Sequence, residues 1–392
     1  MPSCARPSPP LCSSASPRPS KGGAARLCPQ AHPGRHKGQH DRTVLTAVGP
    51  VTLRRCYFAC PACGQGDFGA DRILGLDGYV TAGACRMACL LGVQQSFAAA
   101  QRALAEVAGW ELDDNTIRQL CHATAAAATA TRPERATAEA FAQAAGDPEL
   151  QIDAGKVNTA AGWRDVKVAV FARRPRGAPT TAAQWDERDL PAPAVRSVVA
   201  AVEEAAAFGQ RCAAEAGRLR LTGPGPLSVL GDGAEWVWNL AEQHFPGARG
   251  LLDIYHGAGY IAGGAKAVFG EGSAEALAQA ARGRLRLLAD GYWGVTEWVG
   301  EITGAMPAGG DGAALGGLLN YFAGHQERLG YALRLRRGQS IGSGLVEGSI
   351  KQLVNRRLKQ TGARWKVEHV GPLVELGALA AGPEWQDFWD RN

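Results

Sequence analysis

Two stretches of alternating apolar and polar residues constrain the fold of this chain most. The first is Leu150-Gln-Ile-Asp153, and the second, Trp163 to Val170, follows a turn at Thr159-Ala-Ala-Gly162. Alternation is typical of strands with one buried face, because successive side chains of a strand point to opposite sides. The two stretches predict a β-hairpin that carries Asp153 on its first strand.

Further strands and helices are expected downstream. Leu227 to Asp232 is a short apolar run that ends in an acid, which predicts a strand with a carboxylate at its exit. Residues 234–245 repeat apolar side chains at helical spacing until Pro246, so a helix is expected after that strand. Residues 251–256 are the next strand candidate. Together these elements predict a mixed α/β fold.

A late segment combines a single acid with many cations. Glu347 lies in Gly342-Ser-Gly-Leu-Val-Glu-Gly-Ser-Ile-Lys351, and every other charged residue from Arg328 to Lys366 is basic. Such cations can neutralise phosphates, while a carboxylate offers oxygen to a hard cation, so the pattern indicates phosphodiester chemistry on DNA. We expect DNA contacts from Lys351, one helical turn after Glu347, and from Arg356, Arg357, Lys359, Arg364 and Lys366.

Three acids on two strands and a late helix can converge on a metal site. Asp153, Asp232 and Glu347 could together hold two Mg2+ or Mn2+ ions, one activating the attacking oxygen and the other stabilising the leaving oxygen of a phosphodiester. Mg2+ prefers carboxylate oxygen and retains part of its water shell. Taken singly, each acid has the alternative of being a solvated surface charge.

The order of these motifs is similar to that of a known family. The chain resembles bacterial insertion-sequence transposases of the DDE type, in the Kra-type group related to Mutator-like transposases, from Cys60 to Trp365. The last three of the matching blocks are the specific ones. The blocks are Cys60-Pro-Ala-Cys63-Gly, Asp153, Trp163-Arg-Asp-Val-Lys167, Gly231-Asp232-Gly-Ala-Glu-Trp-Val-Trp238, Leu252-Asp253-Ile-Tyr-His256 and Gly342-Ser-Gly-Leu-Val-Glu347.

The resemblance implies a ribonuclease-H-like catalytic domain with Asp153, Asp232 and Glu347 as catalytic acids and with Asp253 and His256 in auxiliary roles. The implied activity is cleavage of the element ends, followed by strand transfer by the freed 3′ hydroxyl. The implied partners are double-stranded DNA and a second copy of the chain on paired ends. A metal-dependent nuclease of the same fold and a catalytically inactive or domesticated DNA-binding protein are the alternatives.

The chain departs from this family directly after His256. Such proteins usually carry there a helix rich in Ala, Glu, His and Leu, whereas this chain reads Gly257-Ala-Gly-Tyr-Ile-Ala-Gly-Gly264. Each interior glycine weakens a helix by roughly 1 kcal/mol relative to alanine. Asp153 is followed by Ala-Gly rather than directly by Gly, which is expected to alter the turn beside the first acid.

The cysteines indicate a second type of metal site. Ten cysteines in a chain expected in the reducing cytoplasm favour metal ligation or free thiols over disulfides. Cys60 and Cys63 can present two thiolates to one Zn2+, and Cys28 and His32 have the spacing to complete four ligands, with His36 or Cys56 as alternatives. Residues 43–53 can form the hairpin of a zinc ribbon. The alternative is a thiol-bearing turn that has lost its metal.

The remaining regions are predicted from pattern and composition. Residues 96–131 predict two helices, capped by Ser96 and opened by Asn115, that serve either helix-turn-helix recognition or simple packing. Aromatic residues between 293 and 331 are expected in the core of a helical insertion, with stacking on an unpaired base as the alternative. The expected layout is a disordered tail at 1–27, a zinc-ribbon-like segment at 28–72, a helical region at 73–147, the catalytic core at 148–258 and 340–370, the insertion at 259–339 and a C-terminal segment at 371–392.

Charge and hydropathy limit the kinds of binding partner that we expect. The net charge is +5, and basic residues concentrate towards both ends of the chain, which favours a polyanionic partner. No run of 18 or more apolar residues and no apolar signal-peptide centre occurs in the sequence, so we expect a cytoplasmic protein without a membrane partner. The glycine pairs at Gly263 and Gly309 lack the lysine and spacing of a phosphate-binding loop, so no nucleotide cofactor is expected.

Overall fold

The protein is represented by a computed structural model that describes residues 32, 34–132, 136–221 and 227–391. The predicted tail at 1–27 and Cys28 lie outside the described residues. The chain divides into two compact units between Cys85 and Arg86, and each is described by itself. Throughout the described ranges, no helix has the length and apolar character needed to cross a bilayer.

The N-terminal unit is built on a long antiparallel hairpin. Its elements are β1 (Arg35–Thr46), β2 (Gly49–Ala59), β3 (Gly66–Asp67) and α1 (Gly69–Ile73), with β2 in the middle of the sheet. The hairpin predicted over residues 43–53 is confirmed and extends well beyond that range. Asp71 of α1 accepts hydrogen bonds from Arg42 and Arg55, which ties the helix to both long strands.

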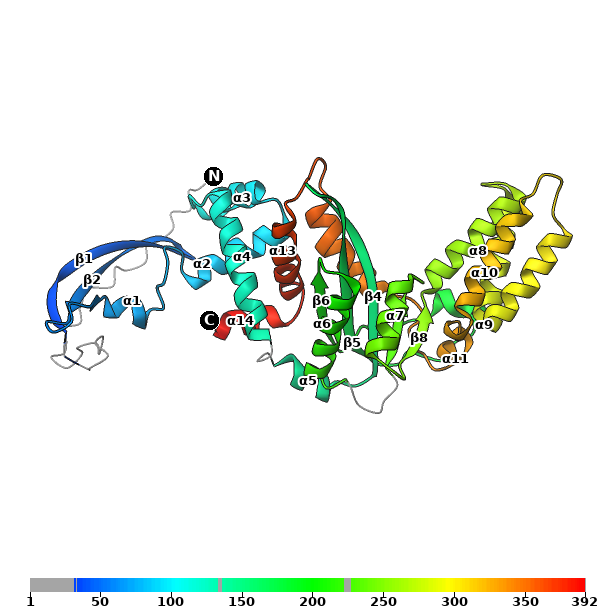
Figure 1. The fold of residues 1–392 in the computed structure, drawn as a ribbon, viewed down its shortest axis with the longest axis horizontal. Helices are drawn as coiled ribbons and strands as arrows, with labels where there is room; N and C mark the ends of the chain where they lie inside the picture. Colours follow the sequence, from blue (N-terminus) through cyan, green and yellow to red (C-terminus); the bar gives the residue numbers. More distant parts are fainter. Residues whose placement is uncertain (1–31, 33, 133–135, 222–226, 392) are drawn as a thin grey trace, which may run out of the picture. The chain divides into compact units, whose positions relative to one another are not determined.

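The larger unit is organised around a five-stranded mixed sheet (Figure 1). In spatial order the strands are β6 (Val195–Ala201), β5 (Gly162–Arg174), β4 (Asp147–Thr159), β7 (Ser228–Gly231) and β8 (Arg249–Leu252). β4 is central. On one side it pairs antiparallel with β5, which pairs antiparallel with β6, and on the other side it pairs parallel with β7, which pairs parallel with β8.

The predicted strands are largely confirmed. β4 and β5 form the expected hairpin and pair along their whole length, and β7 ends directly before Asp232. The strand expected over residues 251–256 is wrong beyond its start, because β8 ends at Leu252. Asp253 caps the next helix, α8 (Ile254–Phe269), by accepting a hydrogen bond from the His256 backbone N–H at 2.9 Å.

Helices cover one face of the sheet with a continuous apolar core. These are α5 (Thr137–Gln143), α6 (Ala205–Arg218) and α7 (Glu235–His244), the last of which confirms the helix expected after β7. Leu150 and Ile152 of β4 pack with Phe208 of α6 and Val237 of α7 in this core. The alternation seen in the sequence thus turns Leu150 and Ile152 towards one helical layer.

The opposite face carries the helix that contains Glu347. Gln151, which alternates with the core residues of β4, points to this face and meets the start of α12 (Gly344–Ile350). The chain continues from α12 into a π-helical segment, Lys351–Arg356, and α13 (Val367–Ala380) packs on β6. The sheet therefore lies between two layers of helices.

A helical subdomain follows β8 (Figure 1). Its elements are α8, α9 (Ala274–Gly304), α10 (Gly312–Gly324), the 3-10 turn Gln326–Arg328 and α11 (Tyr331–Arg336). Trp298, Phe322 and Tyr331 are buried in its core, as expected, whereas Trp293 is 73% exposed. α8 forms in full despite its glycines, because it is packed against α9 and α10.

Three helices open the larger unit. They are α2 (Ala82–Gln94), which starts just before the unit boundary, α3 (Phe97–Ala108) and α4 (Asp114–Thr131). Ser96 caps α3 as predicted, but Asp113 rather than Asn115 begins α4, because its carboxylate accepts the Thr116 backbone N–H at 2.9 Å. α4 packs on α13, so its apolar face serves helix packing.

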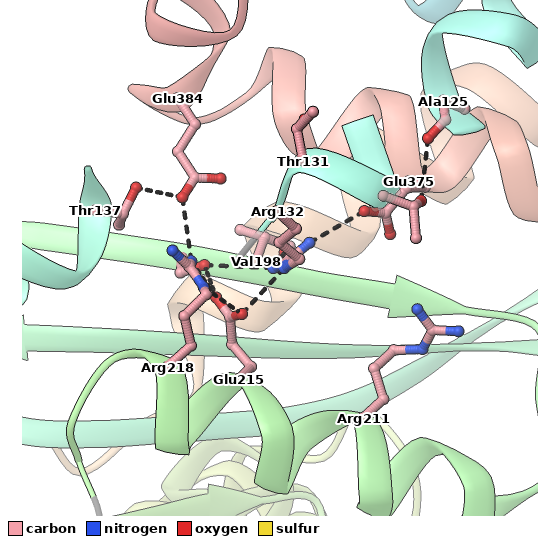
Figure 2. Close-up of polar contacts among 12 residues, drawn as sticks. Ala125, Thr131, Arg132, Thr137, Val198, Arg211, Glu215, Arg218, Glu375 and Glu384 are labelled. Atoms are coloured by element: carbon pink, nitrogen blue, oxygen red, sulfur yellow. Dashed lines mark hydrogen bonds and ion pairs between the residues drawn. The ribbon is translucent and has the colours of Figure 1, made fainter. Parts of the chain in front are cut away.

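Buried ion pairs join the end of α4 to helices that pack on the sheet (Figure 2). Arg132, the residue after α4, contacts Glu215 of α6 at 3.0 Å and Glu375 of α13 at 3.1 Å. Arg218 pairs with Glu215 and with Glu384 of α14 (Glu384–Arg391). Burial alone would raise the pKa of Glu215, but the hydrogen bonds and charges of Arg218 and Arg132 lower it to about 2.

Four predicted segment boundaries fall inside helices or strands. The boundary between residues 72 and 73 lies within α1, the one between 258 and 259 within α8, and the one between 370 and 371 within α13. The boundary between 147 and 148 lies within β4. α13 and α14 pack on one another, and α13 contacts β6. Residues 371–391 therefore do not form a separate segment.

Candidate active site

The strand register places three acids in a row at one end of the parallel strands. Ile152 of β4 is paired with Gly231 of β7, and Gly231 is paired with Leu252 of β8. Asp153, Asp232 and Asp253 each come one residue later. Because parallel strands in register present equivalent positions side by side, the three acids follow one another across the sheet edge.

Asp153 and Asp232 are half-buried, and their electrostatics are coupled. Burial raises the pKa of Asp153 to about 6, and the carboxylates of Asp232 and Glu347 raise it as well. The hydrogen bond from the Ala154 backbone N–H and the nearby His256 act in the opposite direction. Asp153 is therefore an acid crowded by negative charge, as expected of a cation site.

The turn after Asp232 requires glycine. Gly233 has φ +96°, and a Cβ there would lie 2.5 Å from the Tyr321 hydroxyl oxygen. That hydroxyl donates a hydrogen bond to the Asp232 carbonyl at 3.3 Å, while the Asp232 carboxylate accepts the Ala234 backbone N–H at 2.9 Å. The Asp232-Gly233 pair of the sequence thus fixes the acid against α10.

Two buried polar side chains hold the beginning of α12, which carries Glu347. The Gln151 side-chain oxygen accepts hydrogen bonds from the backbone N–H groups of Leu345 and Val346 at 2.9 and 3.3 Å. The Asp253 carboxylate accepts hydrogen bonds from the Ser343 backbone N–H and hydroxyl at 2.5 and 2.8 Å. Because these bonds satisfy donors at the helix start, they position Glu347 beside the two strand acids.

The structure gives Asp253 and His256 different surroundings. Asp253 is fully buried, and both its oxygens accept hydrogen bonds, one from Ser343 and the other from the His256 backbone. Asp253 is thus a positioning residue for the Glu347 helix. The His256 side chain is exposed and lies in a groove with Glu347.

A second glycine, Gly155, makes room for a helix on β4. A Cβ on Gly155 would lie 3.0 Å from the Ile350 side chain and 3.1 Å from the Val354 side chain. Gly155 therefore lets α12 and the π-helical segment lie directly on β4. The turn expected beside Asp153 is not present, because β4 continues through Gly155 to Thr159.

Sequence reasoning identified the acids but missed the residues that position them. Gln151 and Ser343 were not singled out, although Gln151 is a polar residue at a buried strand position. Because Leu150 and Ile152 point to the other face, the alternation alone predicts an exposed Gln151, whereas α12 covers it. The helix expected around Glu347 is the signal that could have identified Gln151, because a helix on the second face of the sheet would bury the polar residues of that face.

The donor set fits a hard divalent cation. Asp153, Asp232 and Glu347 offer carboxylate oxygens only, which is the chemistry that Mg2+ and Mn2+ prefer. Within the described ranges, no three His, Cys, Asp or Glu side chains are close enough together to chelate an ion. Burial is the main cause of the raised pKa of Asp153, and repulsion from the carboxylates of Asp232 and Glu347 adds to it.

An open groove of about 810 Å3 leads to Glu347. α8 and α10 form its walls, and Tyr255, His256 and Tyr260 lie along it. Three glycines of α8 also line the groove. A Cβ on Gly264 would lie 2.8 Å from Leu318, whereas Gly259 and Gly263 have no atom within 4 Å of the Cβ position. Packing within the described protein therefore requires Gly264 but neither of the other two.

Most of the predicted DNA-contacting cations are exposed, with one exception. Lys351, Arg356, Lys359, Arg364 and Lys366 are exposed, and Lys351 lies 3.9 Å from Glu347.

The prediction is wrong for Arg357, which is 2% exposed. Its guanidinium donates to the Gly92 carbonyl at 2.8 Å and lies 4.9 Å from the ring centres of Phe97 and Trp365. Burial lowers the pKa of Arg357 to about 10. Arg357 therefore packs the Glu347 segment onto α2 and α3 and cannot reach a phosphate.

The predicted zinc turn is compact. The Gly64 backbone N–H donates to the Cys60 carbonyl at 3.0 Å, and Gly64 has φ +73°. Cys60 is buried and Cys63 is exposed at this turn. Cys28 lies outside the described residues, so the four-ligand set of Cys28, His32, Cys60 and Cys63 stays a prediction.

Comparison with known proteins does not assign the chain to a family. Neither the family models nor the curated proteins contain a match for this chain.

Proposed function

We propose that the protein is a DNA transposase of an insertion sequence, with a ribonuclease-H-like core built on Asp153, Asp232 and Glu347. One observation carries the proposal: Asp153 and Asp232 follow paired residues of adjacent parallel strands, and the carboxylates of Asp232 and Glu347 both raise the pKa of Asp153. A mixed sheet with β4 between an antiparallel and a parallel pair supports the proposed core.

The metal would be held by the three carboxylates. Two Mg2+ ions bound there would activate the attacking oxygen and stabilise the leaving oxygen of a phosphodiester. The protein supplies the placement: the turn at Gly233 orients Asp232, and the bonds of Gln151 and Asp253 hold the start of the Glu347 helix. Metal binding also requires Asp153 to be ionised, so its pKa of about 6 makes cation binding release a proton at about pH 6 and below.

DNA would approach through the groove and along the cationic segment. The groove opens at Glu347, and the glycines of α8 leave its wall without side chains where a strand could lie close to the backbone. The exposed Lys351 and Arg356 would contact phosphates on the way. Strand transfer of both element ends requires the two ends in one complex, which a homodimer would supply.

The test uses duplexes that carry the DNA flanking this gene, incubated with Mg2+. Cleaved and joined products support a transposase. Cleavage without joining would reassign the chain as a nuclease. Binding without cleavage would reassign it as an inactive DNA-binding protein. An Asp232→Asn variant and a reaction with chelator are the controls, and both should leave the DNA uncut.

A further inference from the structure

A second cavity lies at the other end of the parallel strands. Its volume is about 460 Å3, within the range of small-molecule sites. It is formed where β8 begins, by the end of α7 and by the segment that runs from Glu327 to Gln339. The acids follow the last residues of β7 and β8, so the length of a strand separates this cavity from the candidate active site.

Four arginines line the cavity, against two glutamates. Arg328 is neutralised by Glu242, whose carboxylate it contacts at 2.9 Å, and its guanidinium lies 4.6 Å from the Trp238 ring centre. Glu327 is exposed at the rim. The other three arginines, Arg249, Arg334 and Arg337, have no carboxylate within ion-pair distance among the described residues.

Arg334 lies deepest in this group. It is 8% exposed, and its guanidinium donates to the Ser340 carbonyl at 2.6 Å and to the Ser228 hydroxyl at 2.8 Å. Burial lowers the pKa of Arg334, the carboxylates of Glu149 and Asp147 raise it, and the positive charges of Arg249 and Arg337 lower it further. Both neighbours are thus near enough to repel it.

Arg249 and Arg337 are exposed and make no side-chain hydrogen bond or ion pair within the described part of the chain. Like charges held together around a partly enclosed space cost free energy unless an anion neutralises them. A guanidinium offers paired donors that match the oxygens of a phosphate. Beside them, the apolar side chains of Val229, Phe245 and Pro246 leave room for a larger group attached to that phosphate.

We propose that this cavity is a phosphate-binding site in which Arg249 and Arg337 hold the phosphate of a nucleotide over the buried Arg334. The site is separate from the three carboxylates and does not depend on the proposed transposase activity. The phosphate belongs either to a free nucleotide or to a DNA backbone, and the two sources differ in a binding experiment.

Isothermal titration of the full chain at low salt tests the proposal with inorganic phosphate, deoxyadenosine monophosphate and a 20-base-pair duplex. Arg249→Gln and Arg337→Gln should each weaken phosphate and nucleotide binding about tenfold, the loss expected for one charge-assisted hydrogen bond. Arg336→Gln is the matched control: Arg336 is exposed and carries the same charge, but it does not line the cavity. Its binding should stay within twofold of the parent.

The duplex identifies the source. If phosphate competes with the duplex, and the two cavity variants lose duplex affinity, the ligand is DNA. If the variants lose affinity for the mononucleotide but not for the duplex, the ligand is a free nucleotide. Absence of phosphate and nucleotide binding by the parent overturns the proposal. An equal loss in all three variants also overturns it, because diffuse surface charge would then explain the binding.

Discussion

Replacing Gly263 by leucine should separate stability from activity in this protein. Gly263 is exposed in the interior of α8 and lines the groove beside Glu347, and no atom lies within 4 Å of its Cβ position. A side chain there meets open space in the protein alone. It would occupy space that the proposed function reserves for DNA.

The expected magnitudes follow from these observations. Leucine is favoured over glycine in a helix interior by roughly 0.8 kcal/mol, so Gly263→Leu should raise the unfolding midpoint by about 2 °C. Cleavage should fall about a hundredfold, the loss expected when a strand is displaced by about 1 Å at the reacting centre. The paired assays are thermal unfolding and Mg2+-dependent cleavage of end-containing DNA.

Gly300→Leu is the matched control for this experiment. Gly300 is also exposed within a helix, α9, and also has no atom within 4 Å of its Cβ position, but it does not line the groove. This variant should gain similar stability and cleave at the parent rate. The groove has no role in DNA binding if Gly263→Leu cleaves as well as Gly300→Leu does.

Three further predictions concern the supports of the site. Asp253→Asn should lower the unfolding free energy by about 1–3 kcal/mol and slow cleavage while DNA affinity is kept, because an amide group replaces one oxygen that accepts hydrogen bonds; unchanged cleavage would refute the positioning role. The pKa of Glu215 is about 2 in the fold and ordinarily 4.5, so its ion pairs stabilise the protein by roughly 3 kcal/mol above pH 4.5 and lose this contribution as pH falls towards 2; urea unfolding across that window should show a flatter profile for Glu215→Gln, and identical profiles would contradict the account. Glu347→Gln should abolish cleavage with DNA affinity equal or higher, whereas Lys351→Ala should weaken binding on all sequences and reduce the logarithmic salt slope by roughly one unit; cleavage by Glu347→Gln at the parent rate would remove Glu347 from the site.

Local pattern was enough to predict the strands that carry the first two acids. The alternation around Asp153 and the apolar run before Asp232 report burial on one or both faces, and burial is what their strands show. The capping serine before α3 was also predictable, since its hydrogen bond spans only three residues. The end of β8 was not predicted, because an acid after the apolar pair Leu251-Leu252 is equally compatible with a continuing strand and with the cap of a new helix.

Contacts between distant segments could not be predicted from the sequence. Gln151 meets Leu345 across 194 residues, and no periodicity marks either residue for the other. Arg356 and Arg357 look identical in a basic run, yet one is exposed and the other is buried, because neighbouring residues on a helix point in different directions. Their difference depends on which face of the segment meets α2 and α3.

Titration with Mn2+, followed by its electron paramagnetic resonance signal in the presence of DNA, tests the three-carboxylate site most directly. The account predicts about two bound ions per chain, as two-metal chemistry requires. It also predicts that Asp153→Asn, Asp232→Asn and Glu347→Gln each weaken binding at least about tenfold, the loss expected for a removed ligand. Glu271→Gln, at an acid whose side chain is 85% exposed, should bind as the parent does. Equal Mn2+ binding in all four variants would contradict the proposed site.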